Sequence, residues 1–289
     1  MQIKIFQKGF NYSQDGTGNR LVYHLQGCNL HCPWCANPEG IAIKGALWVS
    51  NEFLIDSICP YGAIDSKQIN RLLCDACNTR ECITRHRTRG IRLSYQEYEI
   101  DAIIEEVKRS SALFYDGGGV TLSGGEPTLQ FEAVKLLLSE LKNLGIHTAI
   151  ETNASHPRLE TLFPLIDLLI MDFKHYDDAL CASVTGVNNA IVKENILKAA
   201  ALHNRVLIRV PVIKSFNDSV TDIWNYVGFF KQHNISNATF EFLPFHEYGR
   251  TKWQQCGMSY VMQDGYVNPE IIALYEKIFM DSNFKLAHT

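Results

Sequence analysis

Short apolar runs alternate with longer amphipathic segments along most of the chain. The apolar runs, typical of buried strands, lie at 21–25, 120–122, 147–151, 168–172, 206–212 and 239–243. Segments with a helical period lie between or after them, at 97–113, 131–144, 191–203, 220–233 and 269–280. Strands that alternate with helices in this way form a parallel sheet. The pattern therefore predicts an α/β fold whose six parallel strands form a partly closed barrel.

The alternation of strand and helix patterns stops between residues 45 and 90. Four cysteines lie in this stretch, at Cys59, Cys74, Cys77 and Cys82. A segment of this length cannot build a sufficient hydrophobic core, and a bound metal would compensate for that. We therefore predict a barrel formed by residues 1–44 and 91–289 and a metal-binding insert at 45–90.

Polar residues follow successive predicted strands, except Arg209, which lies within the fifth. In chain order they are Ser123 to Pro127, Glu151 to Asn153, Asp172 to Lys174, Arg209, and Pro244 to His246. The carboxyl ends of parallel strands meet at one edge of a sheet, which is where barrels and open α/β sheets carry their active sites. These residues are therefore the candidate catalytic and binding residues.

Composition narrows the class of protein. The formal net charge is −4 over 289 residues, which argues against binding nucleic acid through its phosphates. No window approaches the roughly 18 consecutive apolar residues of a membrane span, and the first six residues are too mixed for a signal peptide. We expect a cytoplasmic protein with no membrane partner. Its nine cysteines are then metal ligands or free thiols, because disulfides are rare in that compartment.

Three of the cysteines, Cys28, Cys32 and Cys35, follow the first predicted strand on one short loop. Three thiolates can hold three irons of a 4Fe-4S cluster and leave the fourth iron open to a small molecule. The alternative is a structural zinc site with His24 or His31 as the fourth ligand. The loop alone is compatible with both metals.

The triplet and the strand-end residues together resemble the radical S-adenosylmethionine (SAM) enzymes, and among them the activating enzymes of glycyl radical enzymes. The shared residues are Asp15, Gly16, Gly18, Gly27, the three cysteines, Trp34, Asn37 to Glu39, Gly117 to Pro127, Glu151, Thr152, Asp172, Lys174, Leu243 to His246, and Gly249. The adjacent Lys252 and Trp253 are similar to the type that activates pyruvate formate-lyase, a formate C-acetyltransferase. The resemblance implies a partial (β/α)6 barrel with an iron–sulfur insert, and it favours iron over zinc at the triplet.

The resemblance also implies a reaction. SAM binds the open iron, the reduced cluster cleaves it, and the 5′-deoxyadenosyl radical removes a hydrogen from a glycine Cα of a partner enzyme. A flavodoxin or ferredoxin is implied as electron donor, and we expect a monomer. One alternative is a radical SAM enzyme that acts on a small molecule. Another is a non-catalytic electron-transfer protein, which would have no need of Glu126, Lys174 and His246 beside an open iron.

By the same resemblance, strand-end and loop residues bind SAM. Gly124 and Gly125 let the backbone approach it closely, and Glu126 supports its amino group. The remaining contacts are Lys174, Arg209 and His246 to its carboxylate or ribose, Asn37 on the adenosyl side, and Trp34 against the adenine.

Two further sites are implied by the resemblance. Glu151, Thr152, Asp172 and the carbonyl of Ile170 match a monovalent-cation site, although the family has aspartate at the first position. The alternative is that the two carboxylates pair with Lys174 and Arg209. A second expectation is that Asp15 and Gly16 dock the glycine-bearing loop, although Thr17 and Asn19 depart from the family's proline and isoleucine.

The insert resembles a two-cluster ferredoxin in which each Cys-Pro cysteine ligates the other cluster. Cys59, followed by Pro60, remains from the first motif, and Cys74, Cys77 and Cys82 remain from the second. Crossed ligation makes them one set, so we expect one auxiliary 4Fe-4S cluster. A four-thiolate zinc site is the alternative, because the Cys77–Cys82 spacing is unusually long. Cys181 and Cys256 are expected to be small buried residues without a role.

Overall fold

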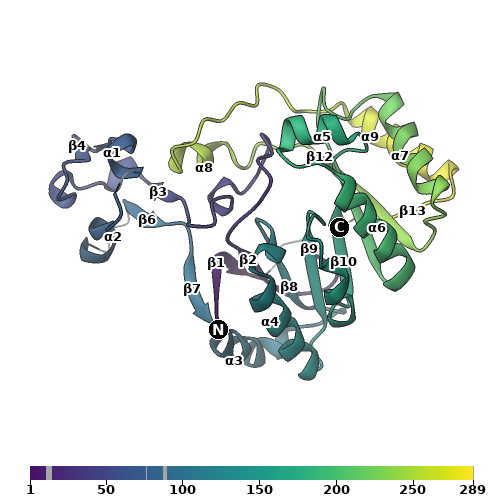
Figure 1. The fold of residues 1–289 in the computed structure, drawn as a ribbon, viewed down its shortest axis with the longest axis horizontal. Helices are drawn as coiled ribbons and strands as arrows, with labels where there is room; N and C mark the ends of the chain where they lie inside the picture. Colours follow the sequence, from purple (N-terminus) through teal and green to yellow (C-terminus); the bar gives the residue numbers. More distant parts are fainter. Residues whose placement is uncertain (11–14, 76, 87–89, 289) are drawn as a thin grey trace.

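The computed structural model describes residues 1–10, 15–75, 77–86 and 90–288. Its main feature is a nine-stranded sheet with the order β13-β12-β11-β10-β9-β8-β2-β1-β7 (Figure 1). The six predicted strands form its parallel centre. They are β2 (Arg20–Leu25), β8 (Gly119–Gly124), β9 (Thr148–Thr152), β10 (Leu168–Asp172), β11 (Val206–Val212) and β12 (Ala238–Pro244). The predicted α/β fold with a parallel sheet is confirmed.

The two edges of the sheet were not predicted. β13 (Lys285–Leu286) pairs with β12, whereas β1 (Gln2–Gly9) runs antiparallel between β2 and β7 (Gln96–Glu99). The predicted helix at 97–113 was wrong at its start, because Glu97 and Tyr98 pair with β1 and α3 (Ile100–Ser110) begins only after them. The ends of the strand order, β13 and β7, do not pair, so the barrel is partial.

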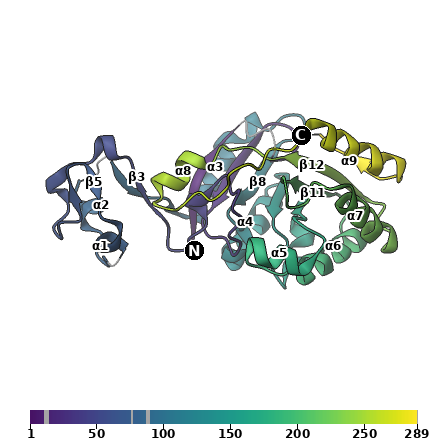
Figure 2. The same ribbon diagram turned by 90° about the horizontal axis from the view of Figure 1, so that it is seen from above.

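Helices cover the outer face of the curved sheet, as Figures 1 and 2 show. The predicted ones are α3, α4 (Phe131–Asn143), α6 (Ala190–Leu202), α7 (Val220–Gln232) and α9 (Pro269–Asp281). In α4 the buried residues Val134, Leu137, Leu138 and Leu141 follow the helical period and face the sheet. The short helices α5 (Asp178–Thr185) and α8 (Arg250–Gln255) were not predicted. No helix in the described ranges is both long and apolar enough to span a membrane.

The insert forms a separate small unit, drawn apart from the sheet in Figures 1 and 2. The antiparallel strands β3 (Leu47–Val49) and β6 (Ile91–Leu93) lead into and out of it. It contains β4 (Ile64–Asp65), β5 (Gln68–Ile69), α1 (Arg71–Asp75) and α2 (Glu81–His86). Its small buried cluster includes Cys74 and Cys82 beside residues such as Leu54 and Ile64. Cys74 and Cys82 are therefore part of the insert's own core.

Candidate active site at the carboxyl edge of the sheet

The three-cysteine loop starts where β2 ends, and hydrogen bonds fix both its ends. Gly27, at a φ of +105°, donates its N–H to the carbonyl of Gly40 at 2.8 Å, and Cys28 donates to the carbonyl of Ile41 at 2.8 Å. Within the loop, the N–H of Cys35 donates to the carbonyl of Cys32 at 3.0 Å. The backbone therefore holds all three thiols on one closed loop at the carboxyl edge of the sheet.

The Gly-Gly-Glu turn after β8 packs directly on the start of this loop. A Cβ on Gly125 would lie 2.2 Å from the carbonyl oxygen of Gly27, and Gly124 has a φ of +119°. The N–H of Glu126 donates to the same Gly27 carbonyl at 2.6 Å. The two glycines are thus required for contact between the turn and the loop, and the contact of Gly124 and Gly125 with SAM stays a prediction.

The three thiols lie in an environment that disfavours their ionisation without a metal. Burial raises the pKa of Cys28, Cys32 and Cys35 to about 12 in each case. Lys174 lies close enough to lower these pKa values. Burial opposes its charge, but Asp172, Cys32 and Cys28 outweigh burial and raise the pKa of Lys174. Three cysteine thiols close to one lysine fit a cluster with three cysteine ligands.

Within the described ranges, no three His, Cys, Asp or Glu side chains converge on a point that a single metal ion could occupy.

The carboxylate of Glu126 is fully buried and bound by protein donors. One oxygen, Oε1, accepts from the hydroxyl of Thr152 at 2.7 Å and the N–H of Thr128 at 3.0 Å, while Oε2 accepts from the N–H of Asn153 at 2.7 Å. Burial raises its pKa, and these hydrogen bonds oppose the rise. Glu126 thereby joins the loops after β8 and β9.

Arg209 links carboxylates on two strands. Its Nε donates to Glu241 at 2.8 Å, and its Nη1 donates to Glu151 at 2.6 Å. Arg209 is fully buried, and its contact with SAM stays a prediction. Although burial favours the neutral form of Glu151, Arg209 and Ser123 lower its pKa. Glu241 was missed in the sequence, although it is the only charged residue in the 239–243 run.

The carboxylate of Asp172 also forms an ion pair with a side chain of the protein. Its Oδ2 lies 3.0 Å from Nζ of Lys174 in a largely buried ion pair. Together with the Arg209–Glu151 pair, this ion pair matches the alternative to the cation site, in which both carboxylates pair with side-chain cations. The two carboxylates of the expected cation site thus each bind a side-chain cation.

Asp15 lies inside the same edge of the sheet. Only 6% of it is exposed, and its carboxyl group bonds to that of Glu151. Burial, reinforced by the charge of Glu151, raises the pKa of Asp15 to about 8. Its side chain is therefore turned inward. The docking role expected for this turn stays a prediction, and residues 11–14 before it lie outside the described ranges.

Two predicted contact residues lie at the ends of β12 and of the cysteine loop. Burial lowers the pKa of His246, and among the described residues its buried Nδ1 has no hydrogen-bond partner. The ring stacks on Tyr248 with centroids 4.2 Å apart. Trp34 packs on Phe216, at 4.9 Å between ring centroids, in an apolar group with Ile213 and Phe245. Both rings are thus neutral groups at the site's edge.

Helix α8 holds the other side of the loop. Its Lys252 donates to Oδ1 of Asn37 and pairs with Glu39, both at 2.8 Å. Its Trp253 donates its indole N–H to the carbonyl of Cys35 at 2.9 Å. No periodicity in the sequence indicated these contacts, because α8 is too short to show one.

The four cysteines of the insert line one cavity, together with residues such as Pro60 and Arg80. Burial, with the charges of Cys59 and Cys77, raises the pKa of Cys82, whereas the backbone N–H of Arg80 lowers that of Cys77. The structure therefore brings together the set that crossed ligation predicted. Cys181 and Cys256 are 2% and 7% exposed, as expected of small buried residues.

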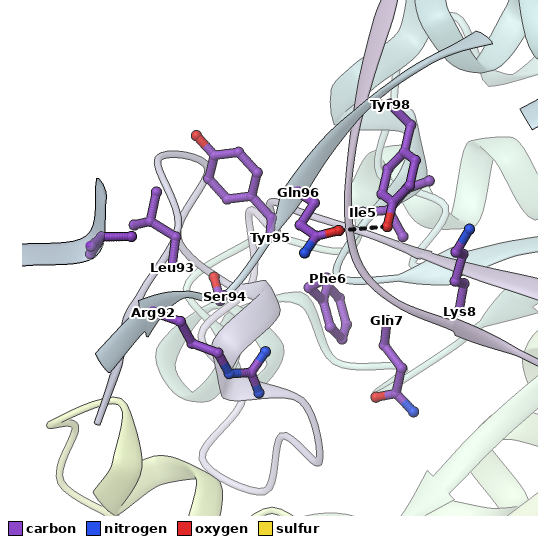
Figure 3. A pocket seen from close by; sticks show the side chains of 11 residues that line it. Ile5, Phe6, Gln7, Lys8, Arg92, Leu93, Ser94, Tyr95, Gln96 and Tyr98 are labelled. Carbon is purple, nitrogen blue, oxygen red and sulfur yellow. Dashed lines mark hydrogen bonds between the residues drawn. The ribbon is translucent and has the colours of Figure 1, made fainter. Parts of the chain in front are cut away.

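A different cavity lies between the β1–β7 edge and the insert (Figure 3). Tyr98 donates to Gln96 at 2.8 Å on its wall, and Phe6 and Lys8 also line it. It contains none of the residues predicted for the site.

Comparison with known proteins gives relatives that belong to one family. The Radical SAM superfamily matches residues 22–225. A 4-hydroxyphenylacetate decarboxylase activating enzyme of Clostridioides difficile is 34% identical over 93% of this chain and 90% of its own length. An isethionate sulfite-lyase activating enzyme of Nitratidesulfovibrio vulgaris is 33% identical over 83% of this chain and 82% of its own length.

Among solved structures, a domain of a pyruvate-formate lyase-activating enzyme from Bacteroides vulgatus matches with a TM-score of 0.50. It is 24% identical and covers 59% of this chain and 98% of its own length, so it supports the fold alone. The family match and the activating enzymes that share a third of their residues with this chain lead to one conclusion. The chain belongs to the radical SAM superfamily and, within it, to the activating enzymes of glycyl radical enzymes.

Proposed function

We propose that this protein installs a glycyl radical on a partner enzyme, using a cluster held by Cys28, Cys32 and Cys35. The observation that carries the proposal is the position of Lys174, which lies beside these thiols while paired with Asp172 at the carboxyl edge of the sheet. When bound, the cluster supplies one electron that cleaves SAM, and the resulting radical takes a hydrogen from a glycine Cα. The protein's own residues bind, orient and shield this site.

The residues divide into those that contact SAM and those that hold them. We propose that Lys174 binds the SAM carboxylate, where a charge-assisted hydrogen bond is strong. His246, with its unpartnered Nδ1 among the described residues, would bind the ribose or carboxylate, and Trp34 would cover the adenine. Asn37 would contact the adenosyl side from the position that Lys252 gives it. Glu126 would accept from the SAM amino group through Oε2, which has one protein donor in the hydrogen bonds described above.

We propose ion pairs in place of the monovalent cation. Arg209 pairs with Glu151 at 2.6 Å, and Lys174 pairs with Asp172 at 3.0 Å, so protein cations already neutralise both carboxylates. Arg209 would then also support the site by fixing Glu151.

The partner, in our proposal, is a glycyl radical decarboxylase or lyase. The relatives that share at least 30% identity activate 4-hydroxyphenylacetate decarboxylase, indoleacetate decarboxylase and isethionate sulfite-lyase. This differs from the formate C-acetyltransferase type expected from Lys252 and Trp253. The likeness to that type is one of fold, to a solved structure at 24% identity.

We also propose that Cys59, Cys74, Cys77 and Cys82 hold one auxiliary 4Fe-4S cluster, since they line one cavity. Residues 45–90 would then be a metal-held unit carried by the barrel of residues 1–44 and 91–289. Iron analysis tests this proposal. About eight irons per reconstituted chain, two cubanes of four, support it, whereas about four irons plus one zinc would disprove it.

The remaining proposals concern the protein's surroundings. We propose a flavodoxin or ferredoxin as electron donor, a monomer as the working state, and a cytoplasmic location in which thiols stay reduced.

The function is tested by incubating the reduced, reconstituted protein anaerobically with SAM. We expect 5′-deoxyadenosine and methionine, and with a decarboxylase or lyase partner a persistent glycine-centred radical in the electron paramagnetic resonance (EPR) spectrum. Cleavage without a radical on any candidate partner would favour a small-molecule substrate. Intact clusters without cleavage would contradict both enzymatic functions and leave electron transfer.

A further inference from the structure

Helix α8 lies between the insert and the three-cysteine loop, as both views of the fold show (Figures 1 and 2). It packs on β3, which leads into the insert, and on the short helix Pro38–Gly40, which follows the loop. A single short helix thus contacts both units.

On the loop side, α8 holds backbone and side-chain atoms. Trp253 donates to the carbonyl of Cys35 at 2.9 Å, and Lys252 binds Asn37 and Glu39 at 2.8 Å each. Gly249, just before the helix, packs so closely that a Cβ there would lie 2.4 Å from the Cys35 carbonyl oxygen. A shift of α8 would therefore move the third cluster ligand.

On the insert side, one residue makes the connection. Arg71 donates from Nη2 to the carbonyl of Gln255, the last residue of α8, and from Nη1 to the carbonyl of Leu47, both at 2.8 Å. Its guanidinium lies against Gly257, where an added Cβ would be 2.5 Å from Nε of Arg71. A cation at carbonyl groups that end a helix is favourable. Arg71 also begins α1, which carries Cys74, so the metal ligand and the connector share one helical turn.

We infer that Arg71 is a positioning residue, through which the insert fixes α8 and, by way of α8, the Cys35 side of the SAM-binding loop. The inference rests on the proposed function in that the loop binds SAM through its cluster. Losing Arg71 would not free the loop completely, because a second chain of hydrogen bonds holds the segment after it. In that chain Ser94, which follows β6, donates to Gln26 at 3.1 Å, and Gln26 donates to the carbonyl of Glu39 at 2.8 Å. Because Arg71 and Cys74 share α1, a metal bound by Cys74 would hold Arg71 in place and so tighten SAM binding at the loop.

The test compares Arg71→Met with Arg92→Met in the full, reconstituted chain. Arg92 is an exposed arginine at the edge of the insert that stacks on Trp48, and among the described residues it makes no hydrogen bond or salt bridge to α8. We expect Arg71→Met to retain both sets of irons, to weaken SAM binding about tenfold and to alter the EPR change that SAM causes. Arg92→Met should match the wild type in both measurements.

A double-mutant cycle with Trp253→Phe tests whether the effect passes through α8. Because both residues hold the same helix, the double variant should bind SAM nearly as well as the weaker single variant. Wild-type affinity and spectrum in Arg71→Met, or losses that add fully in the double variant, would overturn the inference. If Arg71→Met does not reconstitute, Arg71→Lys, which keeps the charge, replaces it in the same cycle. A wild type that binds SAM without cleaving it would refute the proposed function and leave this inference standing.

Discussion

Nη1 of Arg209 on β11 lies 2.6 Å from Oε1 of Glu151 on β9, so the ion pair reaches across β10. A second carboxylate, Glu241 on β12, lies 2.8 Å from Nε of the same guanidinium. The side chain of Arg209 is only 1% exposed. One buried guanidinium thus binds two carboxylates, one on β9 and one on β12.

Arg209→Met should lower the free energy of unfolding by about 3–5 kcal/mol, because it leaves buried carboxylates without their cation. The control is Arg158→Met, which removes a surface pair with Glu132 at 3.0 Å and should cost less than about 1 kcal/mol. Denaturant unfolding measured side by side gives both values. Equal losses in the two variants would show that the buried network carries no special weight.

Asp15 gives the network a pH dependence. Its folded-state pKa of about 8 lies above the ordinary 3.8, so the folded protein holds a proton that the unfolded chain releases between these values. Stability from this group is therefore fully present below about pH 4 and is lost as the pH rises through about 8. Asp15→Asn keeps the size of the side chain and cannot titrate. Between pH 5 and pH 8 its unfolding free energy should fall less steeply than the wild type's, by up to about 1.4 kcal/mol per pH unit. If the unfolding free energies of the two proteins change in parallel with pH, the raised pKa of Asp15 is contradicted.

The sequence sufficed for those parts of the fold that depend on local patterning. The six parallel strands and the amphipathic helices have apolar periods that a single segment displays, as Val134 to Leu141 do. β1 and β7 escaped prediction because their pairing joins residues nearly a hundred positions apart, such as Ile3 and Tyr98. The charges of the site were visible as residues, whereas their partners were not, since only the folded sheet places Glu241 beside Arg209.

Gly125→Ala tests the contact between the Gly-Gly-Glu turn and the cysteine loop. The added Cβ would lie 2.2 Å from the carbonyl of Gly27 and 2.7 Å from that of Gly40, so backbone must move. We expect the variant to fold but to hold about half of the wild-type iron after reconstitution, with the loss confined to the three-cysteine site. Gly228→Ala is the matched control, because outside the backbone of α7 itself no described heavy atom lies within 4 Å of its added Cβ, and it should be neutral or stabilise by up to about 1 kcal/mol. Full iron content in Gly125→Ala would mean that the turn yields without disturbing the loop.

Cys32→Ala and Cys74→Ala separate the two cysteine groups. Cys32 belongs to the loop at the carboxyl edge of the sheet, and Cys74 lies in the insert's own buried cluster and lines its cavity. Cys32→Ala should abolish SAM cleavage, since two remaining thiolates do not hold an open-iron cubane. Cys74→Ala should spare the loop's cluster, keep cleavage measurable and at most lower turnover or folding yield, because its iron is bound elsewhere. Iron analysis with EPR spectroscopy of each reduced variant gives the distribution of clusters, and 5′-deoxyadenosine gives cleavage. Equal loss of the SAM-binding cluster in both variants would contradict two independent sites. If Cys74→Ala keeps that cluster but binds SAM more weakly, the result would match the path from α1 through Arg71 to α8.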